Sequence, residues 1–200
     1  MIVLMSAFLL LSAFSCGGGN KANSTSEQSE ETAVNVPQFD ADSAYLYVKN
    51  QVGFGPRVPN TKEHVACGNY LAGQLEAFGA QVTNQYADLI AYDGTLLKAR
   101  NIIGSYKPES KKRIALFAHW DTRPWADNDP DEKNHNTPIL GANDGASGVG
   151  ALLEIARLVN QQQPELGIDI ILLDAEDYGA PQFYTGQHKE EFWCLGSQYW

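Results

Sequence analysis

The sequence predicts an α/β fold in which helices cover a sheet with at least one parallel pair of strands. Two apolar runs, 113–118 and 168–173, have strand length and the nearly continuous apolar character of strands that are buried on both faces. Residues 146–160, which lie between them, carry apolar side chains at helical spacing. Because a strand–helix–strand unit in one sheet makes a right-handed crossover, we expect the two runs to pair in parallel.

Shorter elements precede this unit. They are a helix that opens at Asp42, a helix over 62–78, and strands over 81–86 and 98–105. Thr61 has a side chain that can cap the second helix, and Gly79 can end it. Each helix is expected to bury one side, and these sides carry Tyr45, Val48 and Val52 in the first helix and Val65, Gly68, Ala72, Leu75 and Phe78 in the second.

The first residues are typical of an export signal. Residues 2–14 form an apolar run of signal-core length, too short to span a bilayer comfortably. The run ends at Cys16 after a small residue, as in a bacterial lipobox, so we expect 1–16 to be a lipoprotein-type signal with the lipid on Cys16. The protein would then be exported, periplasmic and held on a bacterial membrane by this lipid. An ordinary cleaved signal and an uncleaved anchor are the alternatives.

The composition is that of an acidic globular protein behind a tether. Residues 17–36 are rich in Gly, Ser, Asn, Thr and Glu, which predicts a flexible linker, and 37–200 are expected to fold. The net charge of −10 repels phosphate backbones, so nucleic acid is not an expected partner. If Cys16 carries lipid, Cys67 and Cys194 remain, either as a disulfide or as two separate buried thiols.

Polar side chains gather where the two best strands end. His119 and Asp121 follow the first apolar run, Glu176 and Asp177 follow the second, and Asp144 lies in the glycine-rich turn that begins the helix between them. Ligand sites in open α/β sheets form at the carboxyl ends of strands. We therefore expect these five side chains to meet.

This set has the chemistry of a zinc site. Zinc takes histidine nitrogen and carboxylate oxygen, and a catalytic zinc site leaves one position open. Of the adjacent carboxylates Glu176 and Asp177, one can bind the metal while the other moves protons. Taken alone, His119 and Asp121 fit a solvated loop, Asp144 fits a helix N-cap and the Glu176–Asp177 pair fits a solvated strand end. Three such segments in this order favour the metal site.

Four stretches resemble one family. They are HWDTRPWAD (119–127), ILGANDGASGVGALLEIAR (139–157), IILLDAEDYG (170–179) and WCLGSQYW (193–200). They look like those of the bacterial glutaminyl-peptide cyclotransferases, members of the zinc aminopeptidase-like superfamily. Phe54–Arg57, followed by His64 and Cys67, is similar to the opening of the family, so the resemblance covers about 37–200. It implies a three-layer, phosphorylase/hydrolase-like α/β fold with a mixed, mostly parallel central sheet, of which the C-terminal part is missing here.

The resemblance also implies an activity. The family are zinc-dependent acyltransferases that convert the N-terminal glutamine of peptides and proteins to pyroglutamate with release of ammonia. Asp144 and Asp177 match ligands of the single zinc ion, and Glu176 matches the residue that moves the proton from the attacking amine to the leaving ammonia. His119 and Asp121 match positions that bind or support metal in the related aminopeptidases, and with one zinc ion they would orient the site. Where Asp177 stands, family members commonly have Glu, so the shorter Asp needs a closer backbone.

The family implies a third zinc ligand, a histidine beyond residue 200. His188 lies in a polar loop and is not expected to replace it, so we expect the 200-residue chain to bind zinc weakly and to catalyse nothing. A two-metal aminopeptidase on the same scaffold is one alternative, with His119 as a ligand and Glu176 activating water. A non-enzymatic lipoprotein with a decayed fold is the other.

Two tryptophans are candidates for the walls of a substrate pocket. Trp125 lies in a polar loop and Trp193 lies close to the last motif, where a pocket for a neutral glutamine side chain needs apolar walls. The acidic residues of the loop after Trp125 are expected to form a solvated face, and they are Asp127, Asp129, Asp131 and Glu132.

Overall fold

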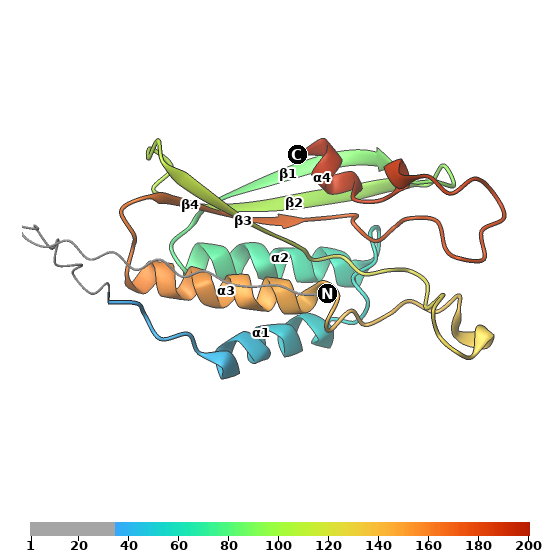
Figure 1. Ribbon diagram of the computed structural model, residues 1–200, viewed down its shortest axis with the longest axis horizontal. Coiled ribbons are helices and arrows are strands. Elements are labelled where there is room, and N and C mark those ends of the chain that lie inside the picture. The colour runs from blue at the N-terminus through green and yellow to red at the C-terminus, as the bar shows by residue number, and fades with distance from the viewer. Residues whose placement is uncertain (1–34) are drawn as a thin grey trace, which may run out of the picture. The chain divides into compact units, whose positions relative to one another are not determined.

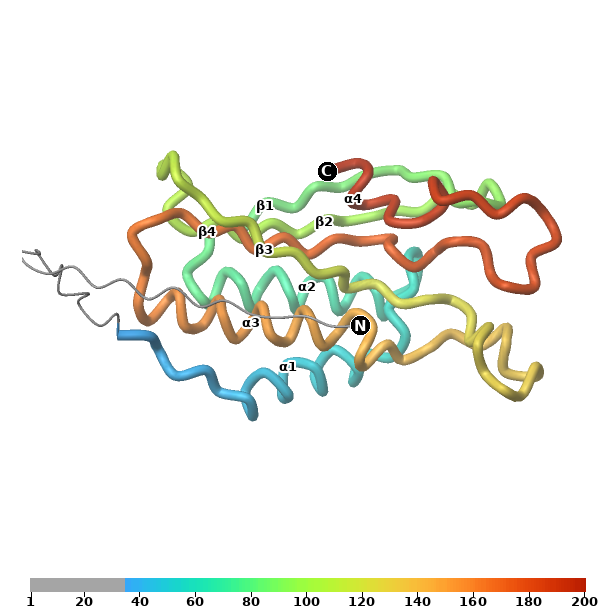
Figure 2. Tube along the Cα trace, viewed as in Figure 1, coloured from blue at the N-terminus to red at the C-terminus, as the bar shows by residue number. Residues whose placement is uncertain are grey.

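The computed structural model describes residues 35–200 (Figures 1 and 2). The predicted signal segment 1–16, its lipidation site Cys16 and residues 17–34 of the predicted linker lie outside the described residues. Residues Val36–Trp200 form one unit, and the account below concerns this unit alone. Within the described part of the chain, no helix is both long enough and apolar enough to cross a membrane.

A four-stranded mixed sheet organises the unit (Figure 1). Its strands are β1 (Gln81–Ile90), β2 (Leu96–Tyr106), β3 (Arg113–His119) and β4 (Gly167–Leu173), in the spatial order β1-β2-β4-β3. The β1–β2 and β2–β4 pairs are antiparallel, and β3 runs parallel to β4. The mixed α/β architecture is confirmed, and the parallel pair is the one that the strand–helix–strand pattern predicts.

Helices lie on both faces of the sheet. They are α1 (Ala41–Gly53), α2 (Lys62–Ala77), α3 (Ala146–Gln161) and α4 (Leu195–Tyr199), with short 3-10 turns at Glu132–Asn134 and Glu190–Phe192. Helices α2 and α3 cover one face, α1 packs against α3, and α4 lies on the opposite face near β1 and β2 (Figure 1). The predicted cap of α2 is present, because the Thr61 hydroxyl accepts a hydrogen bond from the His64 backbone N–H at 3.2 Å.

The main core lies between the sheet and helices α2 and α3. Its fully buried side chains come from both layers, and they include Leu71 and Leu75 of α2, Leu153 of α3, Ile102 of β2 and Ile170 and Leu172 of β4. Full burial of such a side chain stabilises the fold by about 1.5–3 kcal/mol. A smaller apolar cluster on the other face joins Leu97 and Ala99 of β2 to Ala175 and Leu195. The layers are thus fixed on both sides of the strand ends that carry the polar residues.

Strand β3 departs from the expectation of burial on both faces. It lies at the edge of the described sheet, where Ile114 is 48% and Phe117 is 46% exposed. The expectation holds for β4, which lies between β2 and β3 and carries buried side chains on both faces. An apolar run predicts a strand, but whether that strand lies in the centre or at the edge of the sheet depends on which other strands pair with it.

The helices are rotated slightly from the predicted stripes. Tyr45 and Val65, both expected to be buried, are 72% and 57% exposed. In α1 the buried pair is Tyr47 and Gln51, because this side faces α3, where the Gln51 amide donates to the Ala146 carbonyl at 3.1 Å. The buried side of α1 thus includes a polar residue whose amide has a specific partner on α3.

Candidate metal centre

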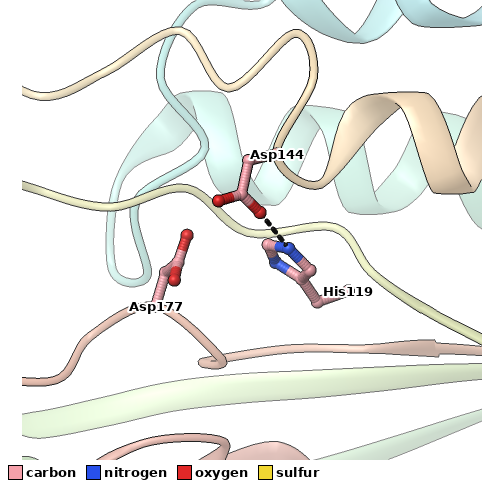
Figure 3. Close-up of side chains that lie close together, drawn as sticks. All are labelled: His119, Asp144 and Asp177. Carbon is pink, nitrogen blue, oxygen red and sulfur yellow. Dashed lines mark hydrogen bonds and ion pairs between the residues drawn. The ribbon is translucent and has the colours of Figure 1, made fainter.

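His119, Asp144 and Asp177 meet at the carboxyl ends of β3 and β4 (Figure 3). One ligand atom from each residue lies within 4.8 Å of the others. The His119 Nε2 atom lies 2.7 Å from an Asp144 carboxylate oxygen. The three segments that the sequence singles out therefore converge, which is the result expected for neighbouring strand ends and the start of their connecting helix.

Asp144 faces this group and does not cap its helix. Helix α3 begins after Gly145 and has no side-chain cap hydrogen bond. The Asp144 side chain is 63% exposed and reaches back to His119. Glycine is required at position 145, because a Cβ there would lie 2.3 Å from the His119 carbonyl oxygen and 2.6 Å from its Nε2 atom. The turn can thus approach His119 closely because Gly145 has no Cβ atom.

Asp121 lies behind the group and is fully buried. One carboxylate oxygen accepts the Glu176 backbone N–H at 3.1 Å, and the other accepts the Asp177 backbone N–H at 3.2 Å. The first oxygen also lies 3.4 Å from the His119 Nδ1 atom. A single carboxylate therefore contacts both the imidazole and the turn that carries the adjacent acids, as the outer partners of metal ligands do.

The electrostatics of the group favour a cation. Burial, together with the charges of Asp121 and Asp144, raises the pKa of Asp177 to about 6. Burial lowers the pKa of His119, but the hydrogen bond and charge of Asp121, with smaller contributions from Asp177 and Asp144, outweigh it and raise this pKa to about 9. These acids thus repel one another and attract positive charge.

One oxygen of Asp177 is buried and has no hydrogen-bond partner among the described residues. Buried polar atoms are normally bonded, so such an atom points to an interaction that the protein atoms do not supply. An imidazole nitrogen and two carboxylate oxygens are a donor set that suits zinc. The residues present therefore fit a divalent metal ion.

Glu176 lies beside this group without belonging to it. The residue is half-buried, and its carbonyl accepts the Cys194 backbone N–H at 3.0 Å. Burial, and next the charge of Glu176, raises the pKa of Cys194. Cys67 and Cys194 are both free, so of the two alternatives for these residues the separate thiols are found.

Arg57 is a part of the site that sequence reasoning missed. It is fully buried, and its guanidinium donates to the carbonyls of Trp120 at 3.1 Å, Leu140 at 2.8 Å and Gly141 at 2.9 Å. Burial lowers the pKa of this arginine. The side chain ties the end of β3 to the turn that precedes Asp144. The only signal in the sequence was its place in the motif Phe-Gly-Pro-Arg.

The two predicted pocket walls, Trp125 and Trp193, share one neighbour. The Arg123 guanidinium carbon lies 5.6 Å from the centre of the Trp125 ring and 4.8 Å from that of Trp193. Arg123 also donates to the Asp177 carbonyl at 3.1 Å and pairs with Asp127. Asp127 is 4% exposed, so its expected place on a solvated face is wrong, because Arg123 and the Gln182 N–H satisfy it in the interior.

Known proteins resemble this chain in both sequence and fold. Residues 101–200 match peptidase family M28. The uncharacterized protein YfbL of Escherichia coli K12 is 35% identical over 115 residues, which are 58% of this chain and 32% of YfbL. The crystal structure of the Bacteroides thetaiotaomicron glutaminyl cyclase bound to N-acetylhistamine is 94% identical, with a TM-score of 0.83 over 83% of this chain and 57% of that chain.

A second solved structure from Bacteroides thetaiotaomicron matches equally well and bears a different description. It is a leucine aminopeptidase precursor with 94% identity and a TM-score of 0.83, covering 84% of this chain and 58% of that chain. The chain thus spans a little over half the length of the solved structures that it matches and about a third of YfbL.

Proposed function

Because the chain belongs to peptidase family M28, we propose that it forms part of a zinc-dependent glutaminyl-peptide cyclotransferase. The observation that carries the proposal is the 94% identity to a solved glutaminyl cyclase over 83% of the chain, and residues 101–200, which match the family, include His119, Asp144 and Asp177. The substrates proposed are peptides and proteins that begin with glutamine. The product is a pyroglutamyl end, and ammonia is released.

The reaction needs one bond formed, one broken and one proton moved. The α-amine nitrogen of the N-terminal glutamine bonds to its own side-chain carbonyl carbon, and the bond from that carbon to the amide nitrogen breaks. The amine loses a proton and the departing nitrogen gains one, so that ammonia leaves. A bound zinc ion supplies Lewis acidity, which polarises the side-chain carbonyl.

The residues divide this work between them. Asp144 and Asp177 would hold the ion, with His119 beside Asp144. Glu176 would take the proton from the amine and deliver it to the departing nitrogen, and its position next to Asp177 and its half-buried state support this role. Asp121 fixes the backbone N–H groups of Glu176 and Asp177, which keeps the proton carrier and the ligand in one orientation.

A zinc aminopeptidase is the second candidate. Two observations favour it, namely the equally similar solved structure described as a leucine aminopeptidase precursor and the position of His119 Nε2 among the candidate ligand atoms. In this reaction Glu176 would take a proton from water instead of an amine, and the first peptide bond would be cut. The fold and the carboxylates are the same in both.

One assay separates the two functions. The complete enzyme of which the chain is proposed to form part is incubated with zinc and a peptide that begins with glutamine, and the products are analysed by mass spectrometry. Cyclisation lowers the peptide mass by one ammonia, whereas an aminopeptidase releases free glutamine. Glu176→Gln should abolish the cyclisation while zinc affinity stays within about twofold, since the residue moves protons and binds no metal. Release of free glutamine, or full activity of Glu176→Gln, would contradict the proposal.

We also propose that the protein is exported and lipid-anchored through Cys16. The support is the apolar run that ends at this cysteine, followed by a polar linker. Metabolic labelling with a tagged fatty acid tests the anchor. The label should be present on the wild type and lost in Cys16→Ser, and an unlabelled wild-type protein would contradict the anchor.

A further inference from the structure

His64 of α2 and Asp174, the residue after β4, form a buried pair beneath the Glu176–Asp177 turn. Their side chains are 4% and 0% exposed. The His64 Nε2 atom lies 2.9 Å and 2.8 Å from the two carboxylate oxygens of Asp174. The imidazole also stacks on the Trp120 ring, with 4.3 Å between ring centres and an interplanar angle of 19°. Neither residue has a role in the reaction described above.

Asp174 is a junction between three elements. Besides the contact with His64 of α2, one of its oxygens accepts the Arg100 backbone N–H of β2 at 2.6 Å, and the other accepts the Ala175 backbone N–H at 2.8 Å. Its own N–H donates to the Asn101 side chain at 3.0 Å. Burial raises the pKa of Asp174, and the hydrogen bond and charge of His64 oppose this rise. The side chain has no route to solvent and every contact fixes its direction.

Ala175, the next residue, has an uncommon backbone conformation. Its φ angle is 51°, in the left-handed region that costs a non-glycine residue about 1–2 kcal/mol. It is fully buried, its N–H is held by Asp174 and its carbonyl accepts the Leu195 N–H at 3.0 Å. A left-handed residue at this place changes the direction of the chain immediately after β4, where Glu176 and Asp177 follow.

We propose that His64 and Asp174 are positioning residues, which hold Ala175 in its left-handed conformation and so present Glu176 and Asp177 to the site. His64 fixes the Asp174 carboxylate, and this carboxylate fixes the Ala175 N–H. If the carboxylate turned away, a buried charge and two backbone donors would lose their partners, which is costly. The consequence for the reaction rests on the proposed function, whereas the effect on the turn does not.

Asp174→Asn is the most direct test. The change keeps the size of the side chain but replaces one acceptor oxygen with an amide group, so at least one of the bonds to His64, Arg100 or Ala175 is lost. Amide hydrogen exchange at residues 175–177, measured by mass spectrometry on the full chain, should become at least about 10-fold faster. Zinc affinity, measured by competition with a chromophoric chelator, should fall by about 10–100-fold.

Glu154→Gln is the matched control. The Glu154 side chain is also fully buried, pairs with Arg157 at 2.6 Å and accepts the Asp40 backbone N–H at 2.9 Å. The Glu154→Gln substitution therefore also replaces a buried carboxylate with an amide. It lies on α3 and contacts none of the turn residues named here. We expect a comparable loss of melting temperature, with exchange at 175–177 and zinc affinity within about twofold of the wild type.

Two substitutions of His64 complete the test and serve if Asp174→Asn does not fold. His64→Phe keeps a ring against Trp120 and removes the donor, so it should reproduce the faster exchange and the weaker zinc binding. His64→Gln returns a donor and should recover part of both. Wild-type exchange and zinc affinity in Asp174→Asn or His64→Phe would overturn the proposal, and so would equal changes in Glu154→Gln. If the variants show the expected exchange pattern but the complete enzyme releases free glutamine instead of ammonia, the positioning role is supported and only the proposed function is contradicted.

Discussion

The floor of the site and its open face use polar groups in opposite ways. In the floor, the four buried residues Arg57, His64, Asp121 and Asp174 direct their polar groups to specific partners, most of them backbone atoms. On the face, Asp144 is mostly exposed and its carboxylate lies against His119, and Asp177 keeps a buried oxygen that has no partner among the described residues. Two residues of the floor lie close in the chain to residues of the site, since Asp121 is two residues after His119 and Asp174 is three residues before Asp177.

The difference distinguishes residues that fix the backbone of the site from residues that can bind a metal ion. The bonds of the floor are internal and fix the backbone, so their loss lowers the stability of the fold. The side chains of the face have oxygen and nitrogen atoms that can bind a group from outside the chain. Two carboxylates and one imidazole are suited to a metal cation. Substitutions in the floor and on the face should therefore have separable effects on stability and on metal binding.

Arg57→Met should have the largest effect on stability. The change keeps much of the length of the side chain but leaves the buried carbonyls of Trp120, Leu140 and Gly141 without donors. We expect the free energy of unfolding to fall by about 3 kcal/mol or more. Urea denaturation measures it, with Lys98→Met as the control, since the exposed pair of Lys98 with Asp88 contributes about 0–1 kcal/mol. Equal losses of unfolding free energy in the two variants would contradict the stabilising role of the buried Arg57.

Asp177→Asn should have the largest effect on metal binding. It removes a charged ligand whose buried oxygen has no protein partner. Zinc affinity should fall by about 100-fold or more, beyond the effect expected for a residue that only orients a ligand. A chelator competition titration gives the value, and Asp88→Asn, an exposed acid far from the group in sequence, should leave it unchanged. Unchanged zinc affinity in Asp177→Asn would remove this residue from the site.

Stability should fall as pH rises while the metal is absent. The pKa of Asp177 is raised from 3.8 to about 6, so the folded state binds its proton more tightly, and the stability from this group is lost as pH rises from about 4 through 6. The pKa of His119 is raised from 6.5 to about 9, so its contribution is present below 6.5 and is lost as pH rises through 9.

Melting temperatures in the presence of a chelator test this dependence. The wild type should lose stability between pH 4 and pH 7 more steeply than Asp177→Asn, and saturating zinc should restore it above pH 6, where the carboxylate is charged. Parallel profiles of the two proteins would contradict the pKa argument.

Asp144→Asn should have the smallest effect on stability. The side chain is 63% exposed and caps no helix, so the free energy of unfolding of the metal-free protein should change by about 0.5 kcal/mol or less. Zinc affinity should fall all the same. A loss of stability as large as that of Arg57→Met would place Asp144 in the floor and not on the face.

The sequence predicted the parts of this picture that local patterns determine. The strands and helices have the expected positions, since apolar periodicity and caps are local properties. The meeting of His119, Asp144 and Asp177 followed from one general rule about strand ends. Of the floor, Asp121 was predicted to orient the site, but the other residues were not, because a buried His64 or Arg57 looks like any other polar residue until its partners, which are far away in the chain, are known.

The same reason explains the errors. Strand β3 was expected to be buried on both faces, yet pairing with β4 alone leaves it at the edge of the described sheet. Asp127 was expected to face solvent, yet Arg123 and the Gln182 N–H satisfy it inside. In both cases a segment far away in the chain takes part, β4 for strand β3 and Gln182 for Asp127, although Arg123 lies only four residues before Asp127.

The central claim is that the open face binds a zinc ion on a rigid floor, and anomalous diffraction at the zinc absorption edge tests it most directly. Crystals of the chain soaked in zinc should show an anomalous peak in contact with Asp144 and Asp177, and crystals of Asp177→Asn should lose or weaken that peak. A wild-type map with no peak at these carboxylates, or with its strongest peak elsewhere in the chain, would contradict the claim.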